Sequence, residues 1–583
     1  MAIELTEEDK LWCKQNHIPI KQFQKVRELF NGDDTEHKFK ELFIQGNNEG
    51  NGEAKQETKQ EEQPRENISF EEWQIKLNEK YQNLINVSNE ELPGLWPSLE
   101  FELSVRDILN IKDCTLPFAG ILLGPPGAKK TLGLQLFRKI PNTFYTDNFS
   151  ARSFVSHSTT VKKEQLPDID MLPKIKDKFF LTPELAPIFG KKDEELMEIL
   201  SIITRILDGH GFESDTGAHG HRGYPIDIMF TWVGAAVDIP YKVHKFLGAR
   251  GAKLYFYRLP LITKSDEEYM DEMTEDDFDI RTKRTQDALI DYLDIFNRCP
   301  NGIKEKNLIK IQWNGGKDDK ESLRVILKLA KLLAHFRAVV STWGKDKDED
   351  YEHAFATIED PTRAMIQLRN LARGHALSQG RNYITTEDMK IIIETVFSTA
   401  SLARVRIFEL LLESEGKLTT SRIVESLNIS DDTARRTMTE LQAIGLVDIQ
   451  EVQGSHGGEP QKQIELVNQF RWFLSKEFKI LNDSHSARKN SVFDEQKNHN
   501  YSMSILLNSV LPRTGTHYTF MSGGKLEEYD SRNNEQEEII PIQIQNSPKI
   551  ECPSCGEIDY PYYIKRHNGC ERQTPKEERE YIK

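Results

Sequence analysis

Hydrophobic positions follow two different spacings along this chain, and the change between them marks its segments. Uninterrupted apolar runs, typical of buried parallel strands, occur in GILL at 120–123, KFFLT at 178–182 and DIMFTWVGA at 227–235. From 320 to 400, apolar residues recur every three to four positions, as in LRVILKLAKLLAHF, which predicts helices. The middle of the chain is therefore predicted to be an α/β domain followed by a helical domain.

Segments of different composition flank or interrupt this region. Residues 46–67 are rich in Gly, Glu, Gln and Lys, so we expect a disordered linker there, after a small helical unit at 1–45. Residues 265–315 are charged and lack a clear period, which suggests an irregular insertion. Residues 481–548 are rich in Asn, Ser and Glu, and we expect a second, largely flexible linker.

A separate small unit is predicted at 401–480. Three helical stretches, LARVRIFELLLESE, TSRIVESLN and ISDDTARRTMTELQAIGLV, follow one another, and Ser430 or Asp431 can cap the third. Two extended segments around a Gly-rich tip come next. This order is that of an α+β winged-helix domain, whose third helix enters the major groove of DNA.

Polar side chains on the third helix and the wing are the predicted DNA contacts. They are Thr433, Arg435, Arg436, Thr439, His456 and Lys462. A winged helix that contacts protein instead is the alternative, because the charge of this unit is near balance.

A Gly- and Pro-rich turn follows the first apolar run and precedes a helix. It approximates the pattern G-x-x-x-x-G-K-[ST] of phosphate-binding loops, in which backbone N–H groups hold phosphate. Its residues are Gly124, Pro125, Pro126, Gly127, Ala128, Lys129, Lys130 and Thr131. Lys130 would neutralise the β/γ oxygens of a triphosphate, and Thr131 would ligate Mg²⁺.

Lys129 takes the place of the second glycine of this pattern. That glycine lets the backbone wrap the phosphates without a Cβ. The Lys129 side chain either adds a second cation or obstructs the loop. An ordinary strand–turn–helix without a ligand is the alternative interpretation of the whole segment.

With this loop, residues from about 120 to 400 resemble AAA+ ATPases, and more loosely their minichromosome-maintenance and MoxR-like branches. The resemblance implies an α/β ATP-binding core at 68–318, which includes an N-terminal helical extension, and an α-helical lid at 319–400. It also implies ATP and Mg²⁺ as cofactors and a homo-oligomeric ring, such as a hexamer.

The resemblance assigns a role to an acidic residue as well. KFFLTPEL lies where the family has four apolar residues followed by Asp-Glu, so Glu184 is the candidate for polarising the attacking water. Thr182 stands in place of the aspartate associated with Mg²⁺. An exposed Glu184 beside a helix cap is the alternative, and Asp177 is a weaker candidate. IMFTWVGAA looks like the sensor-1 strand, with Thr231 as its polar residue.

Arginines complete the site that the resemblance implies. Arg250, in a glycine-flanked turn, is the first candidate for an arginine finger that reaches the neighbouring subunit, and Arg258 is the second. Arg363 follows Pro361 at the start of a lid helix and matches sensor 2, whose guanidinium couples lid closure to ATP. Ordinary surface charge is the alternative for each.

The stretch between the second and third apolar runs is rich in Gly and His. Residues 205–227 read RILDGHGFESDTGAHGHRGYPID, and their His spacing fits no firm metal-ligand pattern. A polar loop or β-hairpin that faces a central pore is predicted, with His219, His221 and Arg222 in contact with nucleic-acid phosphates.

Cysteine and histidine gather near the end of the sequence. Cys552-x₂-Cys555-x₁₁-His567-x₂-Cys570 supplies four tetrahedral N/S ligands for Zn²⁺. Because all four positions are filled, a structural zinc finger is expected at 549–583 rather than a catalytic metal. Unbonded thiols are the alternative.

Composition limits where and how the protein acts. The net charge of −16 repels nucleic acid from the average surface, so DNA contact requires local basic patches. The chain has no run of about 18 apolar residues, so no membrane span is expected. It begins without a signal-peptide pattern, and three of its six cysteines belong to the metal motif, so a cytoplasmic location is expected.

Two functions from different classes remain open. The first is an ATP-hydrolysing, helicase-like motor or loader that acts on DNA in replication or on a mobile element. The second is an ATP-gated, weakly hydrolysing or non-hydrolysing transcriptional regulator, favoured by Lys129 and by the missing acidic pair. A protein-remodelling AAA+ factor whose winged helix binds partner proteins is a third.

Overall fold

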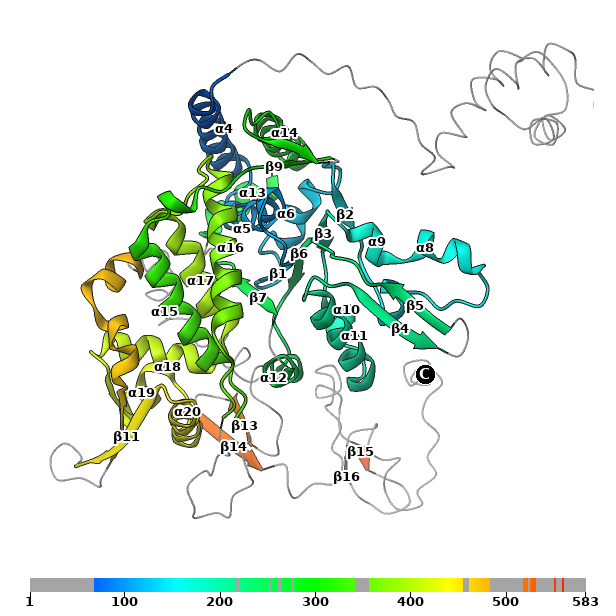
Figure 1. Ribbon diagram of the computed structural model, residues 1–583. Helices are drawn as coiled ribbons and strands as arrows, with labels where there is room; N and C mark the ends of the chain where they lie inside the picture. The colour runs from blue at the N-terminus through cyan, green and yellow to red at the C-terminus, as the bar shows by residue number, and fades with distance from the viewer. Residues whose placement is uncertain are drawn as a thin grey trace, which may run out of the picture. The chain divides into compact units, whose positions relative to one another are not determined.

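The computed structural model in Figure 1 divides the chain into two units, Met1–Asn67 and Ile68–Lys583. It describes residues 68–482, except 217–219, 251–252, 261–263, 275–276, 306, 341–355 and 454–460, together with four short strands between 517 and 559. All described residues belong to the second unit. The predictions for 1–45 and 46–67 lie outside them.

A five-stranded parallel sheet forms the centre of the α/β domain. Its order is β2 (Thr143–Tyr145), β3 (Phe179–Thr182), β6 (Thr231–Ala236), β1 (Phe118–Leu123) and β7 (Leu254–Arg258). The three predicted apolar runs contain β1, β3 and β6, and every residue of these strands is buried. Burial on both faces explains why they read as continuous rather than alternating apolar segments.

Two hydrophobic clusters cover the two faces of this sheet. Alternate strand residues point to opposite faces, so Phe179 and Leu181 belong to one cluster and Phe180 to the other. The first cluster includes α4 (Phe70–Glu91), α5 (Trp96–Asp107), α6 (Lys130–Leu136) and α14 (Phe278–Asn297). The second includes α7 (Ala151–Phe154), α9 (Met171–Ile175), α10 (Ala186–Phe189), α11 (Asp193–Ile206) and α12 (Tyr241–Arg250). The α/β domain is therefore a three-layer sandwich.

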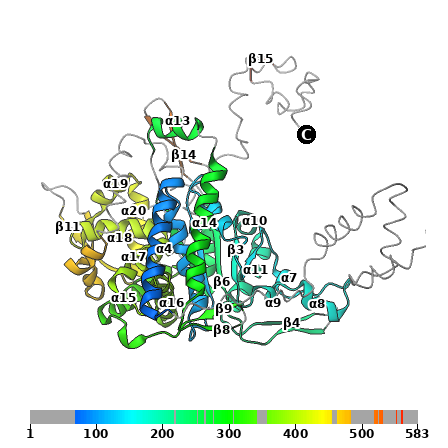
Figure 2. The same cartoon turned by 90° about the horizontal axis from the view of Figure 1, so that it is seen from above.

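The prediction of an irregular insertion at 265–315 is wrong for most of its length. The segment contains α13 (Asp266–Thr274), the 20-residue α14, β8 (Ile303–Glu305) and β9 (Leu308–Lys310). Figure 2 shows α14 beside α4. Leu289, Tyr292, Leu293 and Phe296 recur at helical spacing among the charged residues of α14, and these apolar side chains are buried.

The predicted lid region forms three long helices. They are α15 (Lys320–Arg337), α16 (Thr362–Ser378) and α17 (Met389–Thr399), with a short 3₁₀ turn, η4 (Thr386–Asp388), before the last. α16 packs on α5, and α17 packs on β7. The helical lid is thus joined to the α/β domain along its length.

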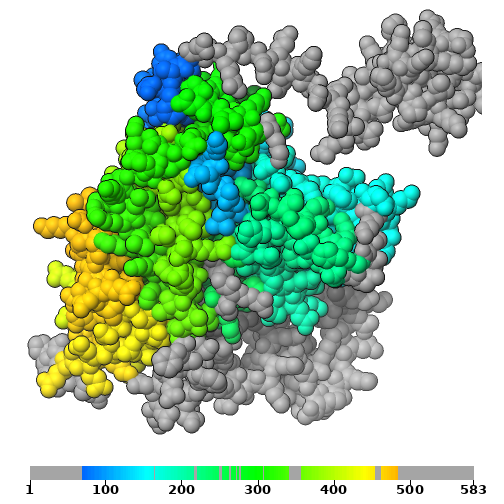
Figure 3. Space-filling view, in the orientation of Figure 1, coloured from blue at the N-terminus to red at the C-terminus, as the bar shows by residue number. Residues whose placement is uncertain are grey.

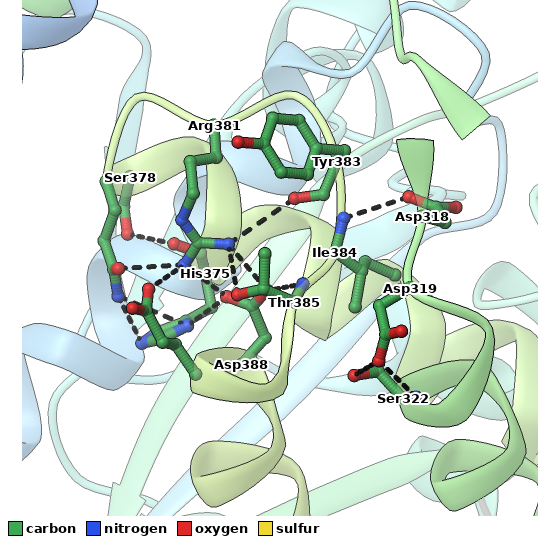
Figure 4. Close-up of polar contacts among 12 residues, drawn as sticks. Asp318, Asp319, Ser322, His375, Ser378, Arg381, Tyr383, Ile384, Thr385 and Asp388 are labelled. Carbon is green, nitrogen blue, oxygen red and sulfur yellow. Dashed lines mark hydrogen bonds and ion pairs between the residues drawn. The ribbon is translucent and has the colours of Figure 1, made fainter. Parts of the chain in front are cut away.

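A buried charged network holds the end of α16 to the start of α17 (Figure 4). His375 Nδ1 lies 2.8 Å from Asp388 Oδ1, and Arg381 contacts both oxygens of the same carboxylate at 2.9 and 3.0 Å. Burial opposes a charged imidazole, but the Asp388 and Glu100 carboxylates outweigh it and raise the pKa of His375 to about 9. Asp388 also accepts the backbone N–H of Thr385, so one carboxylate stabilises both helix ends.

The winged-helix prediction is matched element by element. The unit contains α18 (Leu402–Glu413), β10 (Lys417–Thr419), α19 (Thr420–Leu427), α20 (Asp431–Ala443), β11 (Val447–Val452), β12 (Gln461–Leu466) and η5 (Asn468–Leu474). The strands form an antiparallel sheet in the order β10-β12-β11. Ser430 caps α20 through the N–H of Thr433, as one of the two predicted caps.

This unit packs against the lid helix α15, as the yellow and orange residues beside the green ones show in Figure 3. His335 of α15 lies 2.6 Å from the carbonyl of Ile444 at the end of α20. Arg404 of α18 donates to the carbonyls of Phe336 and Ala338. The lid and the winged helix therefore share an interface made of hydrogen bonds and apolar contacts.

The remaining elements are short. They are η1 (Ile108–Asn110), η2 (Lys163–Gln165), α8 (Leu166–Ile169), β4 (Phe212–Thr216), β5 (Gly220–Tyr224), η3 (Gly315–Lys317), β13 (His517–Ser522), β14 (Lys525–Asp530), β15 (Ile550–Glu551) and β16 (Ile558–Asp559). The antiparallel pair β13–β14 lies within the stretch predicted to be largely flexible. Among the described residues, no helix has the length and apolarity that a membrane span requires.

Candidate functional site

The phosphate loop joins β1 to α6 at the carboxyl edge of the sheet. Ala128 N donates to Pro125 O at 3.2 Å, which closes a tight turn around Gly127 at φ +84°. A side chain is strained in that conformation, so Gly127 is required here. Leu259, just beyond β7, donates its N–H to Leu123 and fixes the start of the loop.

Lys129 has a left-handed backbone conformation, which glycine adopts readily, and this explains why the usual pattern has glycine at this position. Its φ of +56° and ψ of +14° are left-handed, and α6 begins at the next residue. The side chain turns out of the loop, and Nζ donates to the carbonyl of Pro93 at 3.1 Å. Burial, together with Lys264 and Arg281, lowers the pKa of Lys129 against the opposing effect of Glu272. In this conformation Lys129 neither obstructs the loop nor adds a cation to it.

Lys130 and Thr131 are the polar side chains at the start of α6. Nζ of Lys130 donates to the carbonyls of Gly124 and Pro125 at 2.6 and 2.8 Å, so the ammonium lies inside the curve of the loop. Burial lowers the pKa of Lys130, while the nearby Glu184 carboxylate opposes that shift. Thr131 is exposed, and its hydroxyl lies 3.4 Å from the carbonyl of Pro183.

The acidic segment after β3 reaches the same edge of the sheet. Glu184 is exposed, and its Oε1 accepts the N–H of Ala186 at 3.2 Å, at the start of α10. Thr182 does not serve as a substitute for the missing aspartate, because its hydroxyl is fully buried and accepts Trp232 Nε1 at 3.2 Å. Pro183, which has no polar side chain, is the residue that contacts Thr131.

Thr231 lies at the wrong end of its strand for the sensor-1 role. It begins β6 and pairs with Phe118, the first residue of β1, whereas the phosphate loop follows the last residue of β1. Five residues of strand, about 16 Å at a rise of about 3.3 Å, separate Thr231 from the carboxyl edge. Its buried hydroxyl has no hydrogen-bond partner within the described residues.

The polar residue that β6 delivers to the carboxyl edge is Asp238, which the sequence analysis missed. Asp238 Oδ1 lies 3.3 Å from the guanidinium of Arg258 at the end of β7. Arg258 pairs with Leu123 in the sheet register, directly before the phosphate loop. Its side chain is 32% exposed, so this ion pair is accessible beside the loop. Asp238 could have been predicted as a site residue from the sequence, because it follows the end of a buried strand by two residues.

Arg363 is placed at the amino edge of the sheet, away from the phosphate loop. Its guanidinium lies 2.8 Å from Asp208 and donates to the carbonyl of Leu207. One turn along α16, Gln367 donates to the carbonyl of Pro117, which precedes β1. This position does not support the sensor-2 role. Arg250 is the last residue of α12, and its side chain lies outside the described set.

The predicted hairpin between the second and third apolar runs is present as β4–β5. His221 is held between Glu213 and Asp215 at 2.9 and 3.2 Å, so acidic groups surround it. Arg222 is buried and paired with Asp170 at 2.8 Å. Because His221 and Arg222 are each paired with carboxylates of this chain, their surroundings do not favour the predicted contacts with nucleic-acid phosphate. His219 lies outside the described residues.

The third helix of the winged-helix unit presents fewer free side chains than predicted. Arg435 is exposed and paired with Asp431, while Thr433, Arg436 and Thr439 are half-buried. Ala434, Met438 and Leu441 recur at helical spacing and are fully buried, so they form the apolar face of α20. Lys462 lies on β12 opposite Glu451, and His456 lies outside the described residues.

The predicted zinc ligands Cys552, Cys555, His567 and Cys570 also lie outside the described residues. The paired strands β15 and β16 flank the segment that contains the first two cysteines. Among the residues that the structure does describe, no group of three or more His, Cys, Asp or Glu side chains is arranged to hold a metal. The zinc site stays a prediction.

Comparisons with known families match two parts of the chain. Residues 352–399 match the AAA lid domain, and residues 404–458 match an HTH domain. No curated protein matches the chain. The parallel sheet, the loop after β1 and these two matches together support an AAA+ fold with a C-terminal helix-turn-helix domain.

Proposed function

We propose that this protein binds ATP with Mg²⁺ at the loop Gly124–Thr131 and uses it to act on DNA. One observation carries the proposal: the loop follows the interior strand β1 at the carboxyl edge of the sheet, and Lys130 and Glu184 lie together there. Parallel α/β sheets bind ligands at this edge, where backbone N–H groups and helix starts face anionic phosphates.

The residues present fit a triphosphate. The Lys130 side chain points into the loop, where its ammonium donates to two backbone carbonyls. A bound phosphate would replace these neutral acceptors with a charged one. The exposed hydroxyl of Thr131 is the group that would hold Mg²⁺. Mg²⁺ keeps several waters and phosphate oxygens as ligands, so one protein hydroxyl is a workable contribution.

Glu184 is the residue that we propose orients and polarises the attacking water. Its carboxylate is exposed after the end of β3 and, within the described part of the chain, accepts one backbone N–H, which leaves lone pairs for a water. The Asp238–Arg258 pair beside the loop is positioned to respond to the γ-phosphate within the same subunit. Arg258 thereby fits a role in its own subunit better than that of an arginine finger.

Ring assembly and DNA contact complete the proposal. Arg250 ends a helix before the edge strand β7, and we propose that it reaches the nucleotide of a neighbouring copy. The winged helix would bind DNA through Arg435 and Arg436, and its interface with α15 would transmit lid movement to the DNA. A helicase-like motor or a loader is the form of activity that these parts favour.

A slowly hydrolysing, ATP-gated DNA-binding regulator is the second candidate. The observation in its favour concerns the position that usually holds the Mg²⁺-associated aspartate. The Thr182 hydroxyl accepts a hydrogen bond from Trp232, and Thr131 contacts the carbonyl of Pro183, so neither residue supplies a carboxylate there. Nucleotide would then switch the shape of the lid and the winged helix rather than drive repeated cycles.

ATP turnover by the purified chain, with and without DNA, separates the two candidates. The motor predicts turnover that DNA stimulates and that Lys130→Ala and Glu184→Gln each reduce at least about tenfold. The exposed Glu194, in the first turn of α11, gives the matched control Glu194→Gln, which should keep full turnover. Tight ATP binding without turnover supports the regulator, and no ATP binding refutes both.

A further inference from the structure

A hollow of about 360 Å³ lies beside the carboxyl end of β2, between that strand and the helices α7 and α9. β2 is the edge strand, three strands away from β1, or about 14 Å at a strand spacing of about 4.8 Å. The hollow is therefore separate from the proposed ATP site. The hollow is open to solvent, and its volume lies near the lower end of the range of small-molecule sites.

Two cations face this hollow from different helices. Arg152 belongs to α7 and Lys174 to α9, and both are exposed. Within the described part of the chain, neither side chain has a hydrogen-bond or ion-pair partner. In a chain with a net charge of −16, two unpaired cations beside one hollow favour an anionic ligand.

The remaining wall combines aromatic and hydroxyl groups. Phe144 is half-buried, whereas Phe149 is buried with its ring against Phe180 and Trp232, so Phe144 offers the larger aromatic surface. Ser150 and Ser153 line the same hollow and bond to each other at 3.2 Å. An aromatic wall suits a planar ring, and hydroxyls suit the polar groups of a sugar.

We propose that this hollow binds a nucleotide monophosphate unit, with the phosphate between Arg152 and Lys174 and the base against Phe144. Arg152 can donate two parallel N–H bonds to phosphate oxygens, and Lys174 adds a point charge. The ligand is either a free nucleotide or one unit of a single strand, since both present the same phosphate and base.

Hydrogen bonds of Asp170 connect the hollow to the β4–β5 hairpin. This buried carboxylate accepts the N–H of Ser156, which lines the hollow, at 2.6 Å. Its other oxygen accepts Arg222 and Tyr224 of β5 at 2.8 and 2.7 Å. Asp170 itself lies directly before Met171, another lining residue. A ligand that orders α7 and α9 therefore also orders the hairpin.

Calorimetric titration of the full chain with thymidine 5′-monophosphate tests the site. We expect Arg152→Glu and Lys174→Glu each to weaken binding at least about tenfold, because each removes a charge-assisted hydrogen bond and adds repulsion. Lys162→Glu reverses an exposed charge that does not line the hollow and should leave the affinity unchanged. Unfolding midpoints of the three variants check that they remain folded.

Parallel arms identify the source of the ligand and exclude the phosphate loop. Oligothymidylate of five units that binds at least tenfold tighter than the monophosphate, and is weakened by the same two variants, indicates a strand; equal affinities indicate a free nucleotide. Titration of Lys130→Ala shows whether heat arises at the loop, so failure of this site and failure of ATP binding are distinguishable.

A second readout tests the link to the hairpin. Hydrogen exchange of peptides that contain β4 and β5 should slow when thymidine 5′-monophosphate is bound, and should not slow in Arg152→Glu. Heat that inorganic phosphate reproduces in full refutes the role of the base. The proposal is overturned if neither the monophosphate nor the oligothymidylate gives heat, or if both charge-reversal variants bind with the affinity of the parent chain.

Discussion

Replacement of Lys129 by glycine and by alanine tests whether the phosphate loop has the conformation described here. Lys129 has φ +56° and ψ +14°, a left-handed conformation in which a Cβ meets the carbonyl oxygen that follows it. Both variants remove the hydrogen bond from Nζ to Pro93, so that loss cancels when they are compared. The remaining difference between them is the Cβ itself.

The magnitude follows from two opposing terms. A left-handed non-glycine residue costs about 1–2 kcal/mol, and glycine recovers that cost. Glycine also loses more chain entropy on folding, by roughly 0.5–1 kcal/mol relative to alanine. We expect Lys129→Gly to be more stable than Lys129→Ala by about 0.5–1 kcal/mol, or a factor of about two to five in the unfolding equilibrium constant.

Urea unfolding of the two variants, followed by tryptophan fluorescence, measures this difference directly. ATP affinity is measured on the same samples, and we expect both variants to stay within about threefold of the parent chain, because Nζ of Lys129 is directed away from the loop. A more stable alanine variant would refute the left-handed conformation. A tenfold loss of ATP affinity in both variants would instead place the Lys129 ammonium on the phosphates.

Three further predictions concern the lid and the winged helix. Arg363→Ala should lower the free energy of unfolding by about 1 kcal/mol, since it removes a part-exposed pair with Asp208, and should leave ATP affinity unchanged in calorimetry; a large loss of affinity would restore the sensor-2 role. His375 has a folded pKa of about 9, above its unfolded value of about 6.5, so its contribution is complete below about pH 6.5 and is lost as the pH rises toward 9. Unfolding measured across this range should show declining stability, and His375→Gln should flatten the decline; an unchanged slope in that variant would assign the titration elsewhere. The double variant Arg435→Ala/Arg436→Ala should weaken DNA binding and reduce its salt dependence, measured by fluorescence anisotropy, whereas Arg471→Ala, at an exposed arginine of η5, should not; equal binding by the parent chain and both variants would exclude the third helix as the DNA contact.

The strands and the loop that build the site could be predicted from the sequence because their signals are local. Three continuous apolar runs gave three of the five strands of the sheet, and the Gly-Pro turn with Lys130 gave the phosphate loop. The order of the winged-helix elements and the cap of its third helix could also be predicted, because a cap such as Ser430 is a short-range pattern. Each of these features depends on residues within one turn or one strand.

Roles that depend on which end of an element a residue occupies could not be predicted in the same way. Thr231 and Arg363 lie on the expected strand and helix, but at the amino edge of the sheet, where they face away from the loop. Thr182 is one residue from the position that faces Thr131, and the alternation of a strand turns its hydroxyl toward Trp232. Asp238 and Arg258 meet only because β6 and β7 flank β1, which strand order alone determines.

Calorimetric titration of the purified chain with the slowly hydrolysed analogue ATPγS and Mg²⁺ tests the central proposal most directly. Saturable binding that Lys130→Ala weakens at least about tenfold and that Glu194→Gln leaves unaffected is the expected result. Absence of heat with the triphosphate, or equal binding by Lys130→Ala, would contradict the proposal that the loop after β1 holds a nucleotide.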